Sequence, residues 1–318
     1  MATIGKDLKM AAKLLSANEL IAIPTETVYG LAANAFSPEA VAKVFQTKNR
    51  PTFNPLILHT CNLEKAGEFV QEIPEKAKKL ANKFWPGPLT MLFYKKDLVP
   101  DLVTAGLPRV AVRVPRHSIT QQLLQLLPFP LAAPSANPFG YVSPTRPGHV
   151  NDQLGDKIKY ILDGGPCQVG IESTIVGFEE DQVLIYRLGG LSLEDIEKVV
   201  GSVEKLPHSS SQPQSPGMLK SHYAPGKKVL MGDIDQLLAQ IGSRKVGVVS
   251  LQKEFPNLPA DNQVILSRTG NLQEAAAGLF EALRYLDNLP ITYIFAEPMP
   301  DYGLGRAIND RLKRAAAE

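Results

Sequence analysis

Few features of this sequence place it outside the ordinary class of globular proteins. Only two cysteines, Cys61 and Cys167, occur in 318 residues, so we expect no disulfide framework, and a reducing cytoplasm fits. No run approaches the ~20 apolar residues that a membrane-spanning helix needs, and the N-terminus lacks an apolar signal core. The net charge is only +2, which suits phosphate-bearing ligands but does not demand a nucleic acid.

The usual nucleotide-binding and metal-binding motifs are also missing. Without a GxxxxGK[ST] loop or a well-placed GxGxxG, an ATP site must use side-chain cations and hydroxyls in place of a backbone cradle. No HExxH, no paired CxxC and no second histidine at ligand spacing accompany His59, so we expect no protein-bound metal. Ser135 lacks the GxSxG elbow of a nucleophilic serine.

The sequence does contain a regular alternation of apolar strand-like runs and helical patterns, over a length that suits two domains. We predict an α/β fold with one domain over residues 1–205 and a second, with a small and largely parallel sheet, over residues 227–318. Residues 206–226, rich in Ser, Pro and Gln, are a predicted linker or mobile loop. The pattern also predicts an opening helix over residues 3–17 and a loop over residues 139–149.

The stretch Leu20–Asn54 has the features of a small-molecule site. An apolar strand leads into the polar loop Thr25–Thr27, and ligands in α/β sheets usually sit at the carboxyl ends of strands. Ser37 caps a predicted helix that runs to about Lys48. Lys48 and Arg50 are well placed to grip an anion, although a solvated helix end, where cations complement the dipole, is the simpler interpretation of an isolated pair.

Three more arginines fall at strand positions from which they could converge on the same place. Arg109 and Arg113 alternate onto one face of the strand Arg109–Pro115, and Arg187 ends a later strand. Several cations around one cleft suit a nucleotide triphosphate, a carboxylate, or both. The residues alone therefore indicate an α/β protein with a cationic, hydroxyl-lined anion site.

Eight short motifs occur in order at suitable spacing, and the ordered set resembles the YrdC-like threonylcarbamoyl-AMP synthase family. The motifs are PTETVYGLA (24–32), KNRP (48–51), NPLILH (54–59), WPGPLT (85–90), VAVRVP (110–115), APSAN (133–137), LDGGPC (162–167) and GIESTIV (170–176). Two further segments resemble the longer, two-domain branch of the family, SPGMLKSHYAPG (215–226) and GLGRAINDRLKRAA (303–316). The likeness covers nearly the whole chain.

The resemblance implies a YrdC-type three-layer fold with a twisted mixed sheet, followed by a small Rossmann-like domain. It implies a nucleotidyltransferase, L-threonylcarbamoyladenylate synthase, that joins L-threonine, bicarbonate or carbon dioxide, and ATP, and releases pyrophosphate. Magnesium would be held mainly by ATP. A separate transferase complex would pass the threonylcarbamoyl group to an adenosine in tRNA, and a direct, weak tRNA contact is left open.

The family pattern also implies two sets of site residues in this sequence. The residues implied for L-threonine are Thr27, His59, Arg113, Ala133 and Ser173. Those implied for ATP are Lys48, Arg50, Asn54, Arg109, Ser135, Asn137, Ser143, Arg187 and Tyr223. Of these, Lys48 and Arg50 are the predicted catalytic residues, and Arg113 is the predicted partner of the threonine carboxylate.

A linker that closes over the site, with Tyr223 above the nucleotide, would protect a labile product from water. On this hypothesis, replacing Tyr223 by Ala releases more free AMP per turnover. Two other functions stay open: a different carbamoyl-adenylate-forming enzyme, and an RNA-binding module that uses the cationic face. No acylphosphatase-like or zinc-finger region supports the first, and no interleaved basic and aromatic stretch supports the second.

Overall fold

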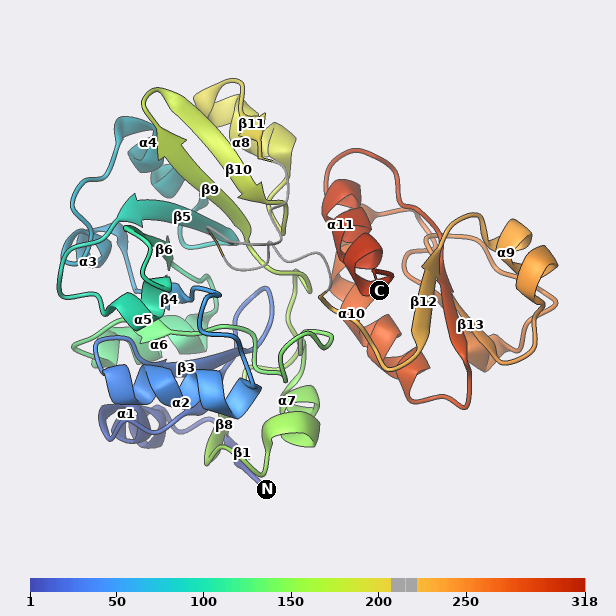
Figure 1. Ribbon diagram of the computed structural model, residues 1–318, viewed down its shortest axis with the longest axis horizontal. Helices are drawn as coiled ribbons and strands as arrows, with labels where there is room; N and C mark the ends of the chain where they lie inside the picture. The colour runs from blue at the N-terminus through green and yellow to red at the C-terminus, as the bar shows by residue number, and fades with distance from the viewer. Residues whose placement is uncertain (207–214, 216–221, 318) are drawn as a thin grey trace.

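The computed structural model describes residues 1–206, 215 and 222–317, which form two β-sheets with accompanying helices (Figure 1). We call residues 1–206 the large-sheet region and residues 222–317 the small-sheet region. Most of the predicted linker, residues 206–226, lies outside the described residues, so the lid hypothesis stays a prediction.

The described part of the large sheet is mixed, with the strand order β1-β8-β2-β3-β7-β4-β6-β5-β9-β10-β11. It combines parallel pairs, such as β4 with β6, and antiparallel pairs, such as β5 with β6. The strands are β1 (Thr3–Gly5), β2 (Ile21–Ile23), β3 (Gly30–Asn34), β4 (Ile57–His59), β5 (Leu89–Tyr94), β6 (Arg109–Arg113), β7 (Leu131–Ala132), β8 (Tyr160–Leu162), β9 (Thr174–Glu179), β10 (Gln182–Arg187) and β11 (Glu204–Lys205). A mixed sheet is what the resemblance implied.

The helices of this region include the predicted helix before Lys48. Ser37 caps α2, because its Oγ accepts the backbone N–H of Ala40 at 3.2 Å, and Asn49 ends the helix in the left-handed conformation at φ +52°. These two ends set the positions of Lys48, the last residue of the helix, and of Arg50, two residues beyond it. The helices are α1 (Leu8–Ser16), α2 (Pro38–Lys48), α3 (Leu63–Gly67), α4 (Glu75–Phe84), α5 (Asp101–Thr104), α6 (Ser118–Leu126), α7 (Pro147–Leu154) and α8 (Leu193–Val200).

Two local predictions are wrong. Residues 3–17 do not form one helix, because Thr3–Gly5 pairs in parallel with β8 and the helix begins only after Asp7, which caps it. Three residues are too few to show a strand alternation in the sequence. The predicted loop over residues 139–149 ends early, because Pro147 stands at the first position of α7, where its missing N–H has no cost.

The small-sheet region has the predicted parallel sheet, in the order β12-β15-β13-β14. Its strands are β12 (Lys228–Met231), β13 (Val246–Ser250), β14 (Gln263–Ile265) and β15 (Tyr293–Ala296). Its helices are α9 (Ile234–Ile241), α10 (Leu272–Asp287) and α11 (Gly305–Ala315), with a short 3₁₀ turn, η1, at Ala260–Asn262. Figure 1 shows α10 and α11 between the small sheet and the large-sheet region, with α9 on the far side.

Helix α10 attaches the two regions closely. Gly170 has φ +75°, and a Cβ built there would lie 2.4 Å from the Cα of Ala277 in α10, so the two backbones meet with no side chain between them. Arg284, also in α10, is buried and donates to the carbonyl oxygens of Val142 and Ser143. Arg284 therefore supplies hydrogen bonds to backbone carbonyl groups of the large-sheet region, while the rest of α10 covers the surface of that region.

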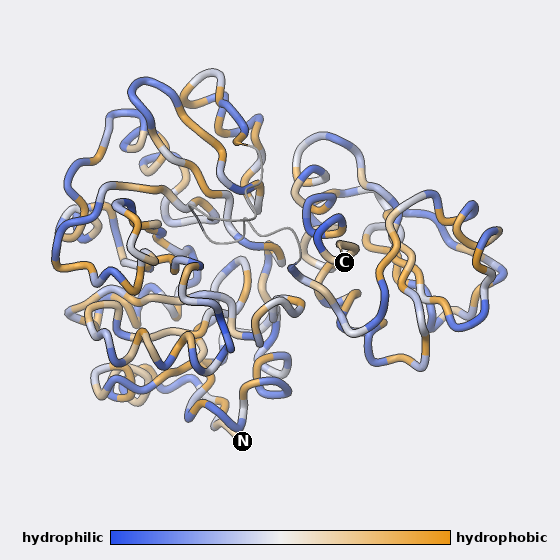
Figure 2. Tube along the Cα trace, viewed as in Figure 1, coloured by the Kyte–Doolittle hydropathy of each residue, from blue (hydrophilic) through white to orange (hydrophobic). Residues whose placement is uncertain are grey.

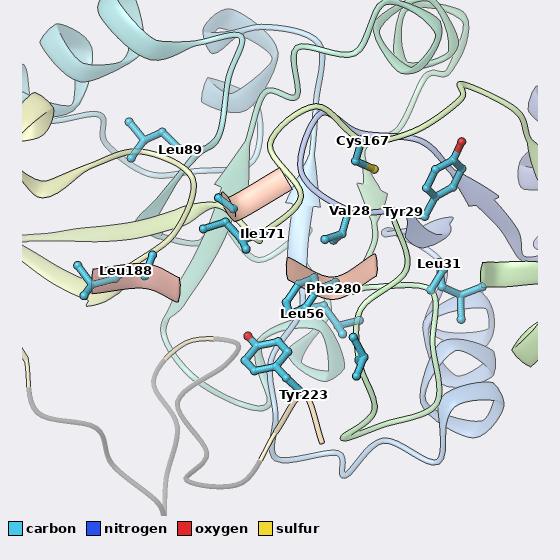
Figure 3. Packing of buried hydrophobic residues seen from close by; sticks show 14 of the residues in the cluster. Val28, Tyr29, Leu31, Leu56, Leu89, Cys167, Ile171, Leu188, Tyr223 and Phe280 are labelled. Carbon is cyan, nitrogen blue, oxygen red and sulfur yellow. The ribbon is translucent and has the colours of Figure 1, made fainter. Parts of the chain in front are cut away.

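One hydrophobic cluster contains residues from both regions. Figure 3 shows Leu56, Ile171 and Leu188 of the large-sheet region in this cluster with Tyr223 and with Phe280 of α10. Helix α11 differs from its surroundings, because Figure 2 shows it as largely hydrophilic although it lies at the contact between the regions.

Candidate active site

A pocket lies at one edge of the large sheet, where β2, β4, β6, β7 and β10 end and β9 begins. Its water-accessible volume is about 60 Å³. This edge is the usual location of a ligand in an open α/β sheet. The lining residues are Thr25, Thr27, Val28, Gly30, Arg50, Pro55, Leu56, Ile57, His59, Arg113, Ala133, Pro134, Ser135, Glu172, Ser173, Arg187, His222 and Tyr223.

One end of the pocket is built from the loop after β2 and from Arg113, the last residue of β6. Arg113 donates through NH1 to Thr27 Oγ1 at 2.8 Å, and its NH2 lies 2.8 Å from Glu26 Oε1 in an ion pair. Thr25 braces the loop, because its Oγ1 donates to the carbonyl oxygen of Val28 at 2.7 Å. The side chains of Arg113, Thr27 and Glu26 are buried. Since a buried charge is costly unless it is paired, Glu26 fixes the guanidinium of Arg113 in position.

His59 and Ser173 lie at the same end. His59 is the register partner of Arg113 across β4 and β6. Burial, with the nearby charge of Arg113, lowers the pKa of His59 to about 3, so its imidazole is neutral near pH 7. The Ser173 hydroxyl lies 2.7 Å from the hydroxyl of Thr90. A guanidinium, a neutral imidazole and several hydroxyls suit a small zwitterion.

The other end of the pocket is cationic. Arg50 donates through NH2 to Asn54 Oδ1 and to the carbonyl oxygen of Pro55, both at 2.7 Å. Arg187 donates through Nε and NH2 to the carbonyl oxygen of Ser173, at 3.1 and 2.9 Å. Backbone carbonyls and an amide therefore orient both guanidinium groups and carry no full negative charge of their own.

Lys48 does not line the pocket but supports this cationic end. Its Nζ donates to the carbonyl oxygen of Ser135 at 2.5 Å and to that of Asn137. Burial, and then the charge of Arg50, lowers the pKa of Lys48 well below its usual value, and burial with the charge of Arg187 lowers the pKa of Arg50. A group of buried cations suits an anionic ligand, because an opposite charge would favour their charged forms.

His222 and Tyr223 close the pocket toward the small-sheet region. Tyr223 is buried and has φ +63°, a left-handed conformation that a tyrosine adopts only where its contacts enforce it. Its ring stacks on Phe280 of α10 at 5.5 Å (Figure 3). The His222 ring packs edge-on against Phe139 at 5.6 Å, and Arg50 lies 5.8 Å above the Phe139 ring. An aromatic chain thus connects α10 to the cationic end of the pocket.

The structure brings most of the predicted site residues together. Those that line the pocket are Thr27, Arg50, His59, Arg113, Ala133, Ser135, Ser173, Arg187 and Tyr223. Those that lie behind the lining and are hydrogen-bonded to it, directly or through Lys48, are Lys48, Asn54, Asn137 and Ser143. Their hydrogen bonds orient the lining residues.

Arg109 is the exception. It begins β6 whereas Arg113 ends it, and four residues of strand separate their positions by ~13 Å. The Arg109 guanidinium donates to Glu179 at 2.8 Å and to the hydroxyl of Tyr186 at 2.9 Å, away from the pocket. The strand alternation correctly places both arginines on one face, but the structure gives no support for an ATP contact by Arg109.

Sequence reasoning considered Glu26 only as the carboxylate of the polar loop after the first strand, and it missed Glu172 and Arg311. Glu172 lies inside the motif GIESTIV, and an acid beside predicted cations is a signal for a buried ion pair. Arg311 of α11 donates through Nε to Glu172 Oε2 at 3.0 Å across 139 positions of sequence. No local pattern pairs residues so far apart.

The described residues contain neither a cluster of metal ligands nor a membrane-spanning helix. No group of three or more His, Cys, Asp or Glu that could hold a metal ion occurs in the part of the chain that the structure describes. Among the helices of the described ranges, none is long and apolar enough to cross a membrane.

The fold and the pocket together define an α/β protein with a buried cationic cleft at one sheet edge. The family model Sua5_yciO_yrdC, described as "Telomere recombination", matches residues 13–189. The model described as "Threonylcarbamoyl-AMP synthase, C-terminal domain" matches residues 191–317. The chain therefore belongs to the threonylcarbamoyl-AMP synthase family, as the motifs predicted.

Similar proteins agree with this assignment over nearly the full length. The chain is 40% identical to the threonylcarbamoyl-AMP synthase of Pyrococcus abyssi, over 97% of this chain and 94% of that one. It is also 40% identical to the Bacillus subtilis enzyme of the same name, over 99% of this chain and 94% of that one. Its fold is similar to the crystal structure of P. abyssi Sua5 complexed with L-threonine, with a TM-score of 0.93, 38% identity, and coverage of 99% and 97%. The predicted fold and enzyme class are confirmed.

Proposed function

We propose that this enzyme joins L-threonine, bicarbonate or carbon dioxide, and ATP into L-threonylcarbamoyl-AMP and releases pyrophosphate. One observation carries the proposal: a single buried pocket has Arg113 with hydroxyls and a neutral imidazole at one end, and Arg50 with Arg187 at the other. An amino acid and a polyphosphate that react together need these two environments side by side. The complex of P. abyssi Sua5 with L-threonine supports the amino-acid half.

In the threonine half, Arg113 binds the carboxylate, because a guanidinium matches two carboxylate oxygens at once. Thr27, Ser173 and His59 lie around the same volume and bind the amine and hydroxyl, and the backbone at Ala133 forms one wall. The neutral state of His59 matters here, because a protonated imidazole would repel the threonine ammonium. The ammonium loses one proton to solvent, the free amine adds to the carbon of carbon dioxide, and the carbamic acid so formed releases a second proton to give the carbamate.

In the ATP half, Arg50 and Arg187 bind phosphate oxygens, and Lys48 holds the backbone at Ser135 and Asn137 in position. The carbamate oxygen attacks the α-phosphorus in line, and the bond from that phosphorus to the pyrophosphate oxygen breaks. Negative charge grows on the phosphoryl oxygens and on the leaving group. Cations fixed in advance stabilise this charge, and loss of one such group typically costs ~10²–10³ in rate.

The remaining predicted residues act indirectly. Asn54 orients Arg50 through its side-chain oxygen. The Ser143 hydroxyl donates to Glu172 Oε1 at 2.6 Å, so we assign it to Glu172 and not to a phosphate. Tyr223 covers the cationic end. We retain, as a proposal, a catalytic domain over residues 1–205, a linker and lid over 206–226, and a second domain over 227–318.

Magnesium fits this site as an ion carried by ATP. Glu172, the acid that lines the pocket, is ion-paired with Arg311, and Glu26 behind the lining is ion-paired with Arg113, so the described residues offer magnesium no unpaired carboxylate there. Magnesium prefers oxygen ligands, and the phosphate oxygens of ATP would supply them in place of protein side chains. Bound in this way, the ion would screen the phosphate charge and polarise the α-phosphate.

The product carries a reactive bond between a carbamate and a phosphate. We therefore propose that it passes promptly to a tRNA threonylcarbamoyl transferase complex, which modifies an adenosine in tRNA. The reaction needs no covalent enzyme intermediate, which agrees with the lack of a nucleophile elbow at Ser135.

The test is pyrophosphate release from ATP and magnesium, with and without bicarbonate, and with L-threonine, L-serine or no amino acid. Release that requires both bicarbonate and L-threonine is the expected result. Release that is indifferent to L-threonine contradicts the substrate assignment. No release, together with binding of structured RNA that weakens steeply with salt, would point to an RNA-binding protein instead.

A further inference from the structure

Helix α11 buries an unusual number of charges. Asp310, Arg311 and Arg314 are exposed by 9%, 0% and 5%, although the helix is among the most hydrophilic segments in Figure 2. Arginine and aspartate are almost never fully buried unless they are paired, because removing a charge from water is costly. Such burial at the contact between the two regions calls for a functional explanation.

Arg311 reaches from α11 to the large-sheet region in several directions. Its Nε donates to Glu172 Oε2 at 3.0 Å, and its NH1 donates to the carbonyl oxygen of Leu188 at 2.7 Å and to Asp310 Oδ2 at 2.8 Å. Its guanidinium carbon lies 5.3 Å from the centre of the Tyr223 ring. One side chain of the small-sheet region thus contacts both the acid and the aromatic residue that line the pocket.

Glu172 is the acid that lines an otherwise cationic pocket. Burial alone would raise its pKa, but the charges of Arg311 and Arg187 and the hydrogen bond from Ser143 outweigh burial, and the pKa lies below its usual value. Glu172 is therefore a carboxylate near pH 7. It would repel the nucleotide phosphates and compete with them for Arg50 and Arg187 if its charge were not balanced.

We propose that Arg311 is a positioning residue for ATP: it neutralises Glu172 and holds its carboxylate, so that Glu172 does not compete with the phosphates for Arg50 and Arg187. This inference rests on the proposed function, because it assumes that the phosphates occupy the cationic end. It gives the small-sheet region a role in the reaction. Through Arg311, α11 sets the charge of a pocket formed mainly by the large-sheet region.

A purely structural role would also make Arg311 important, so the test needs a partner variant. We would measure the dissociation constant for ATP in Arg311→Met, in Glu172→Gln and in the double variant, each as the full chain. Arg311→Met is expected to weaken ATP binding by roughly tenfold to a hundredfold, because one uncompensated carboxylate is left facing the phosphates. Glu172→Gln alone keeps ATP binding within about threefold, and adding it to Arg311→Met restores most of the loss.

Arg306→Met is the matched control. Arg306 lies on the same helix and pairs with Glu194 of the large-sheet region at 2.6 Å, but neither residue lines the pocket. The Arg306→Met substitution removes an ion pair between the regions and is expected to leave the dissociation constant for ATP within about twofold of the original value.

Three results would overturn the proposal. One is a double variant that binds ATP as weakly as Arg311→Met. A second is that Glu172→Gln weakens ATP binding as much as Arg311→Met does, because a purely structural ion pair is broken equally by removing either partner. If Arg311→Met does not fold, Glu172→Gln decides alone, and a loss of ATP affinity well above about threefold overturns the proposal. The third is that Arg306→Met weakens ATP binding as much as Arg311→Met does. ATP binding is measured without turnover, so a wild-type chain that binds ATP but releases no pyrophosphate with threonine would sink the proposed function separately.

Discussion

The two sheets of this molecule both have a cavity near the ends of their strands, and the two cavities differ in chemistry. The pocket of the large sheet has a volume of about 60 Å³ and is lined by Arg50, Arg113 and Arg187. The groove at the small sheet is larger, about 550 Å³. It is lined by Val229, Leu230, Met231, Pro298, Asn309, Lys313 and Ala316. The Rossmann-like sheet thus has the larger cavity, but the reaction that we propose takes place in the smaller one.

The difference lies in how the cations are held. In the pocket, the arginines are buried and oriented by Glu26, Asn54 or backbone carbonyls before a ligand arrives. In the groove, the one cation among the described lining residues is Lys313, which is exposed. A buried, oriented charge acts strongly on a substrate, whereas an exposed lysine is screened by water and must be ordered first. Fold alone therefore does not locate function, even within one chain.

The largest effect is expected where a cation is removed from the pocket. Arg50→Met should lower threonine-dependent pyrophosphate release by ~10²–10³, because charge that develops on the phosphates loses a fixed donor. Arg268→Met, at an exposed arginine of the small-sheet region, serves as control and should stay within about twofold. Comparable losses in both variants would remove the distinction between the two regions.

A second comparison uses the two arginines of β6. Arg113→Lys should raise the KM for L-threonine by ~10-fold to 10²-fold, because a lysine cannot reproduce the paired contacts of the guanidinium. Arg109→Lys, at the other end of the same strand, should change it by less than about threefold. Steady-state kinetics and a melting curve for each variant separate binding from stability. An equal rise in both variants would show that Arg109 does reach the substrate.

The buried imidazole of His59 predicts how stability depends on pH. Its pKa is about 3 in the folded protein and 6.5 as the reference value, so between these values the unfolded chain binds more protons than the folded one. Stability should therefore fall as the pH is lowered through this window, by about 1.4 kcal/mol per pH unit for this one group.

The His59→Gln variant isolates that contribution. Denaturant unfolding between about pH 6 and pH 4 should show a shallower loss of stability in the variant than in the unaltered chain, and both should behave alike above about pH 7. Parallel curves throughout would mean that the pKa of His59 is the same in the folded and unfolded chains. Burial would then not keep the imidazole neutral between about pH 4 and pH 6.

The smallest effect is expected in the groove of the small sheet. Lys313→Ala should change pyrophosphate release and ATP binding by less than about twofold, because Lys313 is exposed and is not among the residues that line the pocket. A larger change would mean that the groove takes part in the reaction, and the contrast between the two sheets would have to be redrawn.

The sequence predicts elements well where a local signal exists. Ser37 marks the start of α2, which ends at Lys48 as predicted, and the alternation of Arg109–Arg113 marks β6. It does not predict the strand Gly30–Asn34, because that strand is short, is buried on nearly all its length and follows a loop rich in hydroxyls. A short buried strand shows no alternation.

The same limit applies to the site. The family motifs imply Thr27, His59 and Ser173, and all three line the pocket. The sequence could not show that Arg109 points to Glu179, nor that Arg311 pairs with Glu172, because both partners come from distant segments. Distances along a strand are predictable from its geometry, but contacts between segments depend on how the whole chain folds.

Because the backbone at Gly170 lies so close to α10, the residue at this position in a related sequence indicates how the two regions of that chain pack. An added methyl group would have to move α10 by about 1 Å to reach an ordinary contact distance, and closely packed interiors do not yield so far without loss of other contacts. A homologous chain with any side chain at this position must therefore place its second region differently, or hold it less tightly. One position in an alignment would then distinguish chains in which α11 can reach the pocket from those in which it cannot.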